Sequence, residues 1–367
     1  MKILLAPNAL KGSLSAKKFI AVAQKTLAPQ HRVRAFVLSD GGDGFIDFFK
    51  SLYPQAKLVS CTAKNAFLKN KRTCFLWLPS QKTAVIETAR ICGLGSAKQT
   101  ELDPLGASSF GVGQVIARAF KLGAKTIYVG LGGVACNDGG AGMAQALGAQ
   151  LFNRHGQPVP PGAKPLLQLH QLDLTAVKKL LRGVKIIGVA DVTNPLLGPK
   201  SSAKVFGPQK GASPTQVKIL DNSMAAWARA LKKATGKNIS SLPSTAAAGA
   251  IAAGLVGVCQ AQLLLGSEFL LQKTPLLSEL KAADLVITCE GKLDKQTFYG
   301  KAPFAVLKAA KKLRKPVLFI CGQVDEKALR RQPFLPTQLA VLSDFSSNLQ
   351  DAKKHAVRYV ARVLKNI

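Results

Sequence analysis

The chain has 367 residues, of which 47% are hydrophobic, so it is long enough for two domains that each bury a core. Lysine and arginine number 51 against 19 aspartates and glutamates, which gives a net charge of +32. These basic residues are spread over most helical segments, aromatic residues make up only 6%, and no nucleic-acid-binding motif is present. We therefore expect a solvated basic surface that attracts small anions, and no nucleic-acid partner.

Membrane, secretion and zinc signals are weak. No apolar run reaches the roughly 18 residues of a membrane span, and MKILLAP indicates a first strand rather than a secretory signal. The seven cysteines are scattered without CxxC spacing, and the four histidines form no HExxH-like cluster. We expect a cytoplasmic protein with reduced core cysteines, no zinc site and no membrane partner.

Strand-like runs alternate with helical ones along the whole chain. The expected strands are KILLAP, VRAFVLSD, AKLVSCTA, KRTCFLWLP, TAVIETA, TIYVGLG, KIIGVAD, DLVITCE, PVLFICG and QLAVLSD. Segments 16–28 and 108–123 have helical spacing, while KRTCFLWLP and QKTAVIETA, joined by PSQK, are typical of a hairpin. This alternation predicts an α/β fold with a largely parallel sheet.

Two glycine-rich loops each follow a strand. Residues 36–45 read FVLSDGGDGF, and residues 130–143 read GLGGVACNDGGAGM before a run of helix formers. Glycine lets a ligand approach backbone N–H groups, and a helix N-terminus favours negative charge, so both loops suit a phosphate or carboxylate. The alternative is a tight strand-to-helix crossover with no ligand. The candidate binding residues are Asp40, Gly41, Gly42, Gly132, Gly133, Asn137, Asp138, Gly139 and Gly140.

Acidic residues fall where the expected strands end. These are Asp40, Asp191, Glu290 and Asp344, with Asp138 just beyond a strand. Ligands of open α/β sheets bind at the carboxyl ends of strands, so this placement favours function. Helix capping is the alternative for Asp344 and for Asp325.

Irregular segments also carry candidates. Segments 155–165 and 194–214 are long loops of the kind that often serve a site, and Lys210 lies in the second. The small-residue segment 241–257 is expected to be a loop entering a tightly packed helix, with a backbone-lined anion loop as the alternative.

Five blocks, in this order, resemble the bacterial glycerate kinase family of the glycerate 2-kinase type. They are APNALKGSLSA, LSDGGDGF, GLGGVACNDGGAGM, ADVTNPLLGPKSSAKVFGPQKGAS and ITCEGKLDKQTFYGKAP. The resemblance implies ATP-dependent phosphorylation of D-glycerate to 2-phosphoglycerate with Mg²⁺, although the 3-position stays open. It also implies a discontinuous Rossmann-like domain of residues 1–80 plus 282–367 and an inserted α/β domain of residues 81–281, with a cleft between them. A homodimer is left open.

Phosphoryl transfer needs a base, a carboxylate-held metal and cations, and the family blocks contain candidates for each. Asp191 is the expected base or metal-orienting carboxylate, and Lys11 is the expected catalytic cation. Glu290 and Asp294 suit Mg²⁺ or ribose, while Lys292 and Lys301 suit phosphate. A turn acceptor is the alternative for Asp191, and a solvated helix start is the alternative for Glu290 and Asp294.

The chain also departs from the family pattern. Asn8 and Ala9 stand where the family has an aspartate and a serine, and Lys292 and Leu102 stand where arginines are usual. Val134 and Cys136 replace a serine and a threonine of the long glycine loop. A second hypothesis follows, in which a protein of this fold has lost catalysis and binds an anionic metabolite or an acidic partner.

Overall fold

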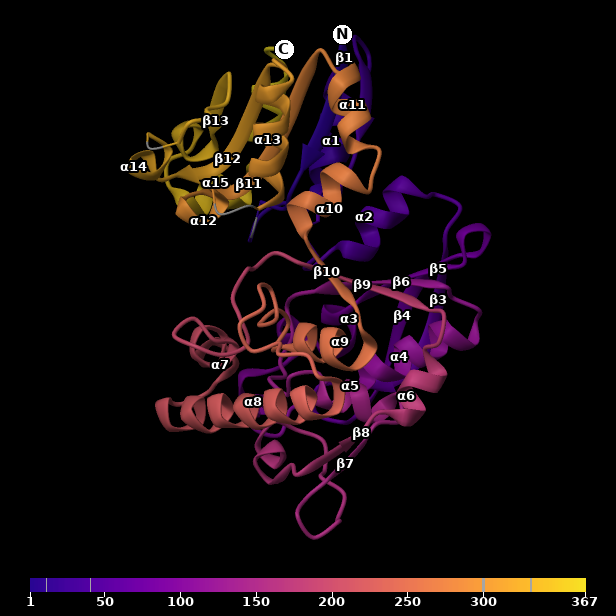
Figure 1. Ribbon diagram of the computed structural model, residues 1–367. Helices are drawn as coiled ribbons and strands as arrows, with labels where there is room; N and C mark the ends of the chain where they lie inside the picture. Colours follow the sequence, from indigo (N-terminus) through magenta and orange to yellow (C-terminus); the bar gives the residue numbers. More distant parts are fainter. Residues whose placement is uncertain (11, 40, 299–300, 331) are drawn as a thin grey trace. The chain divides into compact units, whose positions relative to one another are not determined.

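A five-stranded parallel sheet combines the first two strands of the chain with its last three (Figure 1). Its order is β13-β12-β11-β1-β2, and every neighbouring pair is parallel. The strands are β1 Lys2–Pro7, β2 Arg32–Ala35, β11 Leu285–Leu293, β12 Val317–Val324 and β13 Gln338–Val341. The strand order reverses between β1 and β11, and in doubly wound sheets ligands bind outside the carboxyl ends at that reversal.

Helices cover both faces of this sheet. Helices α1 (Ala16–Leu27) and α16 (Ala356–Leu364) pack on one face, where Ile3 and Leu5 join their core cluster. Helices α11 (Leu276–Ala282) and α13 (Ala302–Lys312) contact β1 as well, and Leu4, which alternates with Ile3 and Leu5, is also buried. The remaining elements are α10 Gly266–Gln272, α12 Lys295–Phe298, α14 Glu326–Leu329, the 3₁₀ turn Leu342–Phe345 and α15 Leu349–Lys354. Burial on both faces explains why these strands are continuous apolar runs in the sequence.

A second, six-stranded sheet has the order β10-β9-β6-β5-β4-β3. Four strands are parallel, namely β5 Thr83–Glu87, β6 Thr126–Leu131, β9 Lys185–Ala190 and β10 Gln262–Leu265. Strands β3 Lys57–Lys64 and β4 Asn70–Leu78 complete it as antiparallel neighbours, which confirms the expected hairpin between β4 and β5. A separate ribbon pairs β7 Gln150–Phe152 with β8 Gln171–Asp173.

The helices of this part are α2 Phe45–Leu52, α3 Thr88–Cys92, α4 Phe110–Lys121, α5 Ala141–Ala146, α6 Thr175–Leu180, α7 Ser202–Phe206, α8 Pro214–Thr235 and α9 Ile251–Cys259. Helix α9 is buried on nearly every side, as expected for segment 241–257. A Cβ on Gly254 of this helix would lie 2.8 Å from the carbonyl oxygen of Gly139, so small residues let the helix and the glycine loop touch. Trp227 of α8 donates its indole N–H to the same carbonyl at 2.8 Å.

The structure describes residues 1–10, 12–39, 41–298, 301–330 and 332–367, and these form two compact units. One comprises Met1–Asp40 and Gly266–Ile367, and the other Gly41–Leu265. These boundaries differ from the expected ones after residues 80 and 281. Strand β3 pairs with β4 and β4 pairs with β5, so both strands belong to the second sheet rather than to the first. Helix α11 contacts β1 of the first sheet, although the expected boundary assigned it to the other domain.

The α/β class is confirmed, with one parallel and one mixed sheet. None of the described helices is long and apolar enough to cross a membrane. The strand expected at VRAFVLSD is shorter than predicted, since β2 ends at Ala35.

Candidate active site

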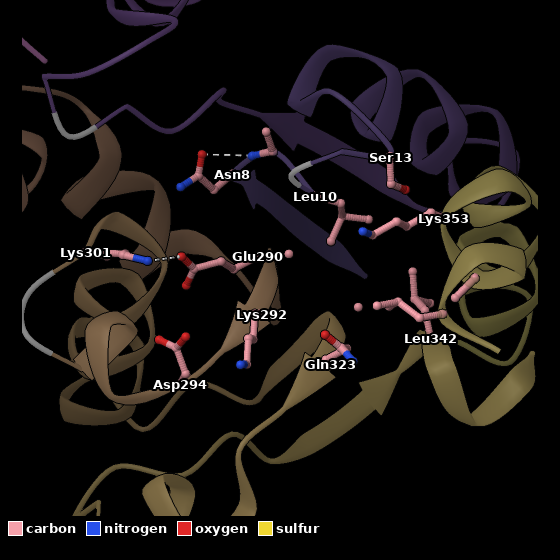
Figure 2. Close-up of a pocket in the computed structure, with 15 residues that line it drawn as sticks. Asn8, Leu10, Ser13, Glu290, Lys292, Asp294, Lys301, Gln323, Leu342 and Lys353 are labelled. Carbon is pink, nitrogen blue, oxygen red and sulfur yellow. Dashed lines mark hydrogen bonds and ion pairs between the residues drawn. The ribbon is translucent and has the colours of Figure 1, made fainter. Parts of the chain in front are cut away.

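A cavity of about 270 Å³ lies at the carboxyl edge of the first sheet (Figure 2). It is lined by residues that follow or end β1, β11 and β12 and by the C-terminal elements: Asn8, Ala9, Leu10, Ser13, Glu290, Gly291, Lys292, Asp294, Lys301, Gly322, Gln323, Leu342, Leu349, Ala352 and Lys353. We call this cavity the pocket. It includes the reversal of strand order between β1 and β11, where an open α/β sheet binds its ligand.

Glu290 and Lys301 form an ion pair in the pocket. The Lys301 ammonium donates to Glu290 Oε1 at 2.9 Å, and the Glu290 residue is only 5% exposed. The other oxygen, Oε2, is buried and has no hydrogen-bond partner within the described part of the chain. A buried carboxylate oxygen without a donor is costly, so this atom is a candidate ligand-binding atom.

The expectation that Glu290 ends its strand was wrong. Strand β11 continues to Leu293, and Glu290 is in register with Cys321 of β12. Two glycines sustain the pairing beyond this point, because a Cβ on Gly322 would lie 2.6 Å from the carbonyl oxygen of Gly291. The longer strand carries Lys292 into the pocket lining.

Asp294 and Lys292 differ in their surroundings. Asp294 Oδ1 accepts from the Thr297 N–H at 3.4 Å at the start of α12, so the helix-start interpretation of Asp294 holds for this oxygen. Lys292 is exposed, and its ammonium forms no ion pair with any described residue. The pocket therefore presents a cation and carboxylate oxygens side by side.

Within the second unit, the backbone that begins at Gly41 touches the long glycine loop. A Cβ on Gly132 would lie 2.7 Å from Gly42 Cα, and one on Gly41 would overlap the Val189 carbonyl oxygen. Gly41 has φ +103° and Gly133 has φ +61°, conformations that favour glycine. The glycines at these positions are thus required by close packing and by backbone geometry, whether or not a ligand binds.

Asp138 lies within the fold rather than at its surface. Its Oδ2 accepts from Ser109 N at 2.7 Å, Ser109 Oγ at 2.9 Å, Ser108 Oγ at 3.1 Å and Gly142 N at 3.1 Å. Its Oδ1 accepts from Gly140 N at 3.2 Å, and the residue is 0% exposed. We call these residues the loop network. Asp138 fixes the loop to the start of α4 and the first turn of α5.

Lys210 is a buried cation beneath the same loop. Its ammonium donates to the Cys136 carbonyl oxygen at 2.7 Å and to Asn137 Oδ1 at 3.0 Å, and burial lowers the pKa of Lys210. The Asn137 Nδ2 atom is buried without a hydrogen-bond partner in the described chain. Lys210 donates to the loop at Cys136, and Trp227 of α8 donates to it at Gly139. The loop is therefore held by two different segments of the chain.

Glu87 is an acidic strand end that sequence reasoning missed. It ends β5, is 4% exposed, and accepts from Ile46 N at 3.0 Å and Gly44 N at 3.3 Å, which holds the start of α2. Burial raises the pKa of the Glu87 carboxyl. Its neighbour Thr88 donates to the Gly130 carbonyl oxygen at 2.8 Å. Asp40, Asp191 and Glu290 had been selected by the same signal, an acid at the end of an apolar strand.

The other acidic and basic candidates lie at strand ends, at helix starts or outside the described residues. Asp191 directly follows β9 and is exposed. Lys11 and Asp40 lie outside the described residues. Asp325 caps α14 by accepting from Ala328 N, as the alternative interpretation expected, whereas Asp344 lies inside a 3₁₀ turn that it does not cap. The described residues contain no ready cluster of three or more His, Cys, Asp or Glu side chains for a metal ion.

A doubly wound sheet with a charged pocket at its carboxyl edge is typical of α/β proteins that bind a ligand at that edge. Comparison with known proteins is more specific. The profile of the glycerate kinase family matches residues 3–367. The glycerate kinase of Bacillus subtilis (strain 168) is 34% identical, covering 100% of this chain and 97% of that protein. The glycerate 2-kinase of Escherichia coli (strain K12) is also 34% identical, with 100% and 97% covered.

A solved structure agrees with this. The chain is 31% identical to a crystal structure from Salmonella typhimurium LT2, provisionally described as glycerate kinase 2, with a TM-score of 0.83 and coverage of 100% of this chain and 96% of that one. The chain therefore belongs to the glycerate kinase family.

Proposed function

We propose that this protein is a glycerate kinase that transfers the γ-phosphoryl group of ATP to the 2-hydroxyl of D-glycerate, giving 2-phosphoglycerate and ADP. The observation that carries the proposal is the length of the similarity. The family profile spans residues 3–367, and two relatives named as kinases of glycerate align over the whole chain.

In this reaction the glycerate oxygen bonds to the γ-phosphorus as the bond to the β,γ-bridging oxygen breaks, and the hydroxyl proton passes to a base. We assign the base to Asp191. Its support is its position, exposed at the carboxyl end of the parallel strand β9. Lys11, outside the described residues, is assigned as a cation for the developing charge on the strength of its sequence block alone.

Nucleotide phosphates are assigned to glycine loops and lysines. Backbone N–H groups around Gly132 and Gly133, together with the loop at Asp40, Gly41 and Gly42, are the proposed anion donors. The N–H groups of Gly139 and Gly140 already donate to Gly249 and Asp138, so the proposed role of these two glycines is to shape the loop. Lys292 and Lys301 are the proposed cations in the pocket. The proposed role of Asp138 is to hold its loop in place, since its oxygens already accept five hydrogen bonds. Asn137, with an unpartnered buried Nδ2, is the proposed contact side chain of that loop.

Mg²⁺ is proposed to bind at Glu290 and Asp294, and the assignment of Asp191 as a metal ligand rests on its sequence block alone. The fit rests on the unpartnered buried Oε2 of Glu290 and on the hard oxygen donors that Mg²⁺ prefers. The ion would neutralise charge on the phosphates. Lys301, paired with Glu290, would then keep that carboxylate oriented toward the pocket.

The proposal describes a cytoplasmic enzyme that acts on small molecules, with a discontinuous domain formed by both chain ends. Its support is the scattered cysteine pattern and a sheet in which β1 pairs with β11. Whether it acts as a homodimer would be read from its mass in solution.

The test is an ADP-release assay with D-glycerate, ATP and Mg²⁺, followed by phosphorus NMR of the product. We expect 2-phosphoglycerate, and we expect Asp191→Asn to lower kcat by at least about a hundredfold if it serves as the base. A 3-phosphoglycerate product would correct the regiochemistry, and full activity of Asp191→Asn would remove Asp191 from the mechanism. Absence of any phosphorylated product would refute the kinase assignment.

One observation favours a second candidate, a protein that binds its ligands without turnover. Asn8, where the family has an aspartate, lines the pocket, and its Oδ1 accepts from the Ala9 N–H at 2.8 Å. An amide is a weaker metal ligand than a carboxylate. Tight binding of ATP or glycerate without ADP release would support this candidate.

A further inference from the structure

The pocket has two chemically different sides (Figure 2). One side carries the charged groups of Glu290, Lys292, Asp294 and Lys301. The other is formed largely by aliphatic side chains at the ends of β1 and β13 and on α15, namely Leu10, Leu342, Leu349 and Ala352. A three-carbon hydroxy acid would gain little from contact with these aliphatic side chains, because nearly all its atoms are polar or carry polar groups.

The aliphatic side is partly uncovered. Leu10, Leu342 and Ala352 are 2–3% exposed and form a firm wall, whereas Leu349 is 37% exposed at the same pocket. Next to this wall lie the Gln323 amide and the Lys353 ammonium, and neither side chain has a hydrogen bond or ion pair within the described part of the chain. An apolar surface flanked by free polar groups suits a flat heteroaromatic ring with polar edges.

We infer that this side of the pocket receives the nucleoside of ATP, with the base against Leu10, Leu342, Leu349 and Ala352 and the phosphates extending toward Lys292 and Lys301. Gln323 is a hydrogen-bond partner for the base edge or the ribose. The inference rests on the proposed function for the identity of the nucleotide. It assigns specificity to residues that the sequence alone did not single out.

The test uses the full-length protein and three probes measured by calorimetry: ATP, inorganic tripolyphosphate and D-glycerate. Ala352→Trp fills the aliphatic side, and Leu349→Gln changes an exposed wall residue whose replacement should not disturb the core. We expect ATP affinity to fall more than about tenfold in Ala352→Trp and about threefold to tenfold in Leu349→Gln. Tripolyphosphate affinity should stay within about twofold, because that probe has no base.

Ala282→Trp is the matched control, since Ala282 is exposed and lines a different groove of the same unit. It should leave all three affinities unchanged. Thermal melting verifies that each variant is folded. If Ala352→Trp does not fold, the affinities of Leu349→Gln alone test the inference. Unchanged ATP affinity in a folded wall variant, or equal loss of ATP and tripolyphosphate, would overturn the inference.

Failure of the inference and failure of the proposed function give different results. Glycerate phosphorylation with an ATP KM insensitive to both wall variants would keep the function and reject the nucleoside placement. ATP binding that is sensitive to the wall, without glycerate phosphorylation, would keep the placement and reject the function. A wild-type protein that binds no ATP would reject both.

Discussion

Two buried acidic side chains, one in each compact unit, have opposite hydrogen-bonding states. Asp138 accepts five hydrogen bonds and its carboxylate is fully satisfied. Glu290 accepts from Lys301 through one oxygen, while its other oxygen has no partner among the described residues. A satisfied buried carboxylate stabilises the fold, whereas an unsatisfied one lowers stability and can be retained for binding. The two sites should therefore respond to substitution in opposite ways.

The largest expected effect is on the loop network. Asp138→Ala leaves two buried backbone N–H groups of the glycine loop and the Ser109 N–H without their acceptor. We expect a loss of about 4 kcal/mol in the free energy of unfolding, measured by urea titration with fluorescence detection. Asp173→Ala is the control and should cost less than about 1 kcal/mol, because Asp173 ends the short strand β8 and accepts from the N–H of its near neighbour Thr175. Equal losses in the two variants would contradict a special structural role for Asp138.

The next effect tests whether the glycines are needed for packing. Gly41→Ala places a methyl group on the Val189 carbonyl oxygen at φ +103°, so we expect about 3 kcal/mol of destabilisation. Gly44→Ala, at φ +85° but with no atom within 4 Å, should cost only about 1 kcal/mol. Unfolding midpoints of both variants give the comparison. If Gly44→Ala lowered stability as much as Gly41→Ala, backbone strain at positive φ, rather than steric contact, would explain why glycine is needed at these positions.

Much of the fold was predictable because of how its strands are buried. Strands β1, β6, β9, β11 and β12 are covered on both faces, so they are apolar runs bounded by polar residues. Strands β7, β8 and β10 were not predicted; each has only three or four residues, and β7 and β8 pair with each other in a separate ribbon. The expected boundary after residue 80 was implied by the family resemblance, and it divides the β4–β5 hairpin, which keeps β3, β4 and β5 together in the second sheet.

The candidate site was predictable in residue type but not in role. An acid at a strand end looks the same in sequence whether it anchors a loop, as Asp138 and Glu87 do, or faces a cavity, as Glu290 does. The Glu290–Lys301 pair spans eleven residues and forms only because β11 and the start of α13 converge. The aliphatic wall around Leu342 and Ala352 comes from elements with no motif at all.

Substitution of Glu290 in the pocket should have the opposite effect to substitution of Asp138, with a large loss of activity and little loss of stability. Glu290→Gln keeps an acceptor for Lys301 and removes a buried charge whose second oxygen lacks a donor. We expect kcat/KM for glycerate phosphorylation to fall about a hundredfold, or about 2.7 kcal/mol, with stability unchanged or raised by up to about 1 kcal/mol. Glu326→Gln, an exposed acid of the same unit, should change neither quantity. Large destabilisation by Glu290→Gln, with activity retained, would make Glu290 a second structural carboxylate.

The smallest effect concerns the cation beneath the glycine loop. Burial lowers the pKa of Lys210 from its ordinary value of 10.5, so the unfolded chain holds this proton more tightly than the folded one. Folding is then favoured as pH rises through the folded-state pKa toward 10.5, and this contribution is lost as pH falls. Lys210→Met abolishes the titration. The stability of the wild type minus that of the variant should therefore increase as pH rises toward 10.5.

Taking this difference cancels the titration of cysteines that do not interact with Lys210, such as Cys289, whose thiol pKa is raised by burial. Lys218→Met, at an exposed position on α8, should give no such pH dependence. A difference that stays constant with pH would mean that Lys210 remains fully charged over this range, held by Cys136 and Asn137. The lysine would then support the loop as a permanent cation, through its hydrogen bonds to the Cys136 carbonyl oxygen and Asn137 Oδ1.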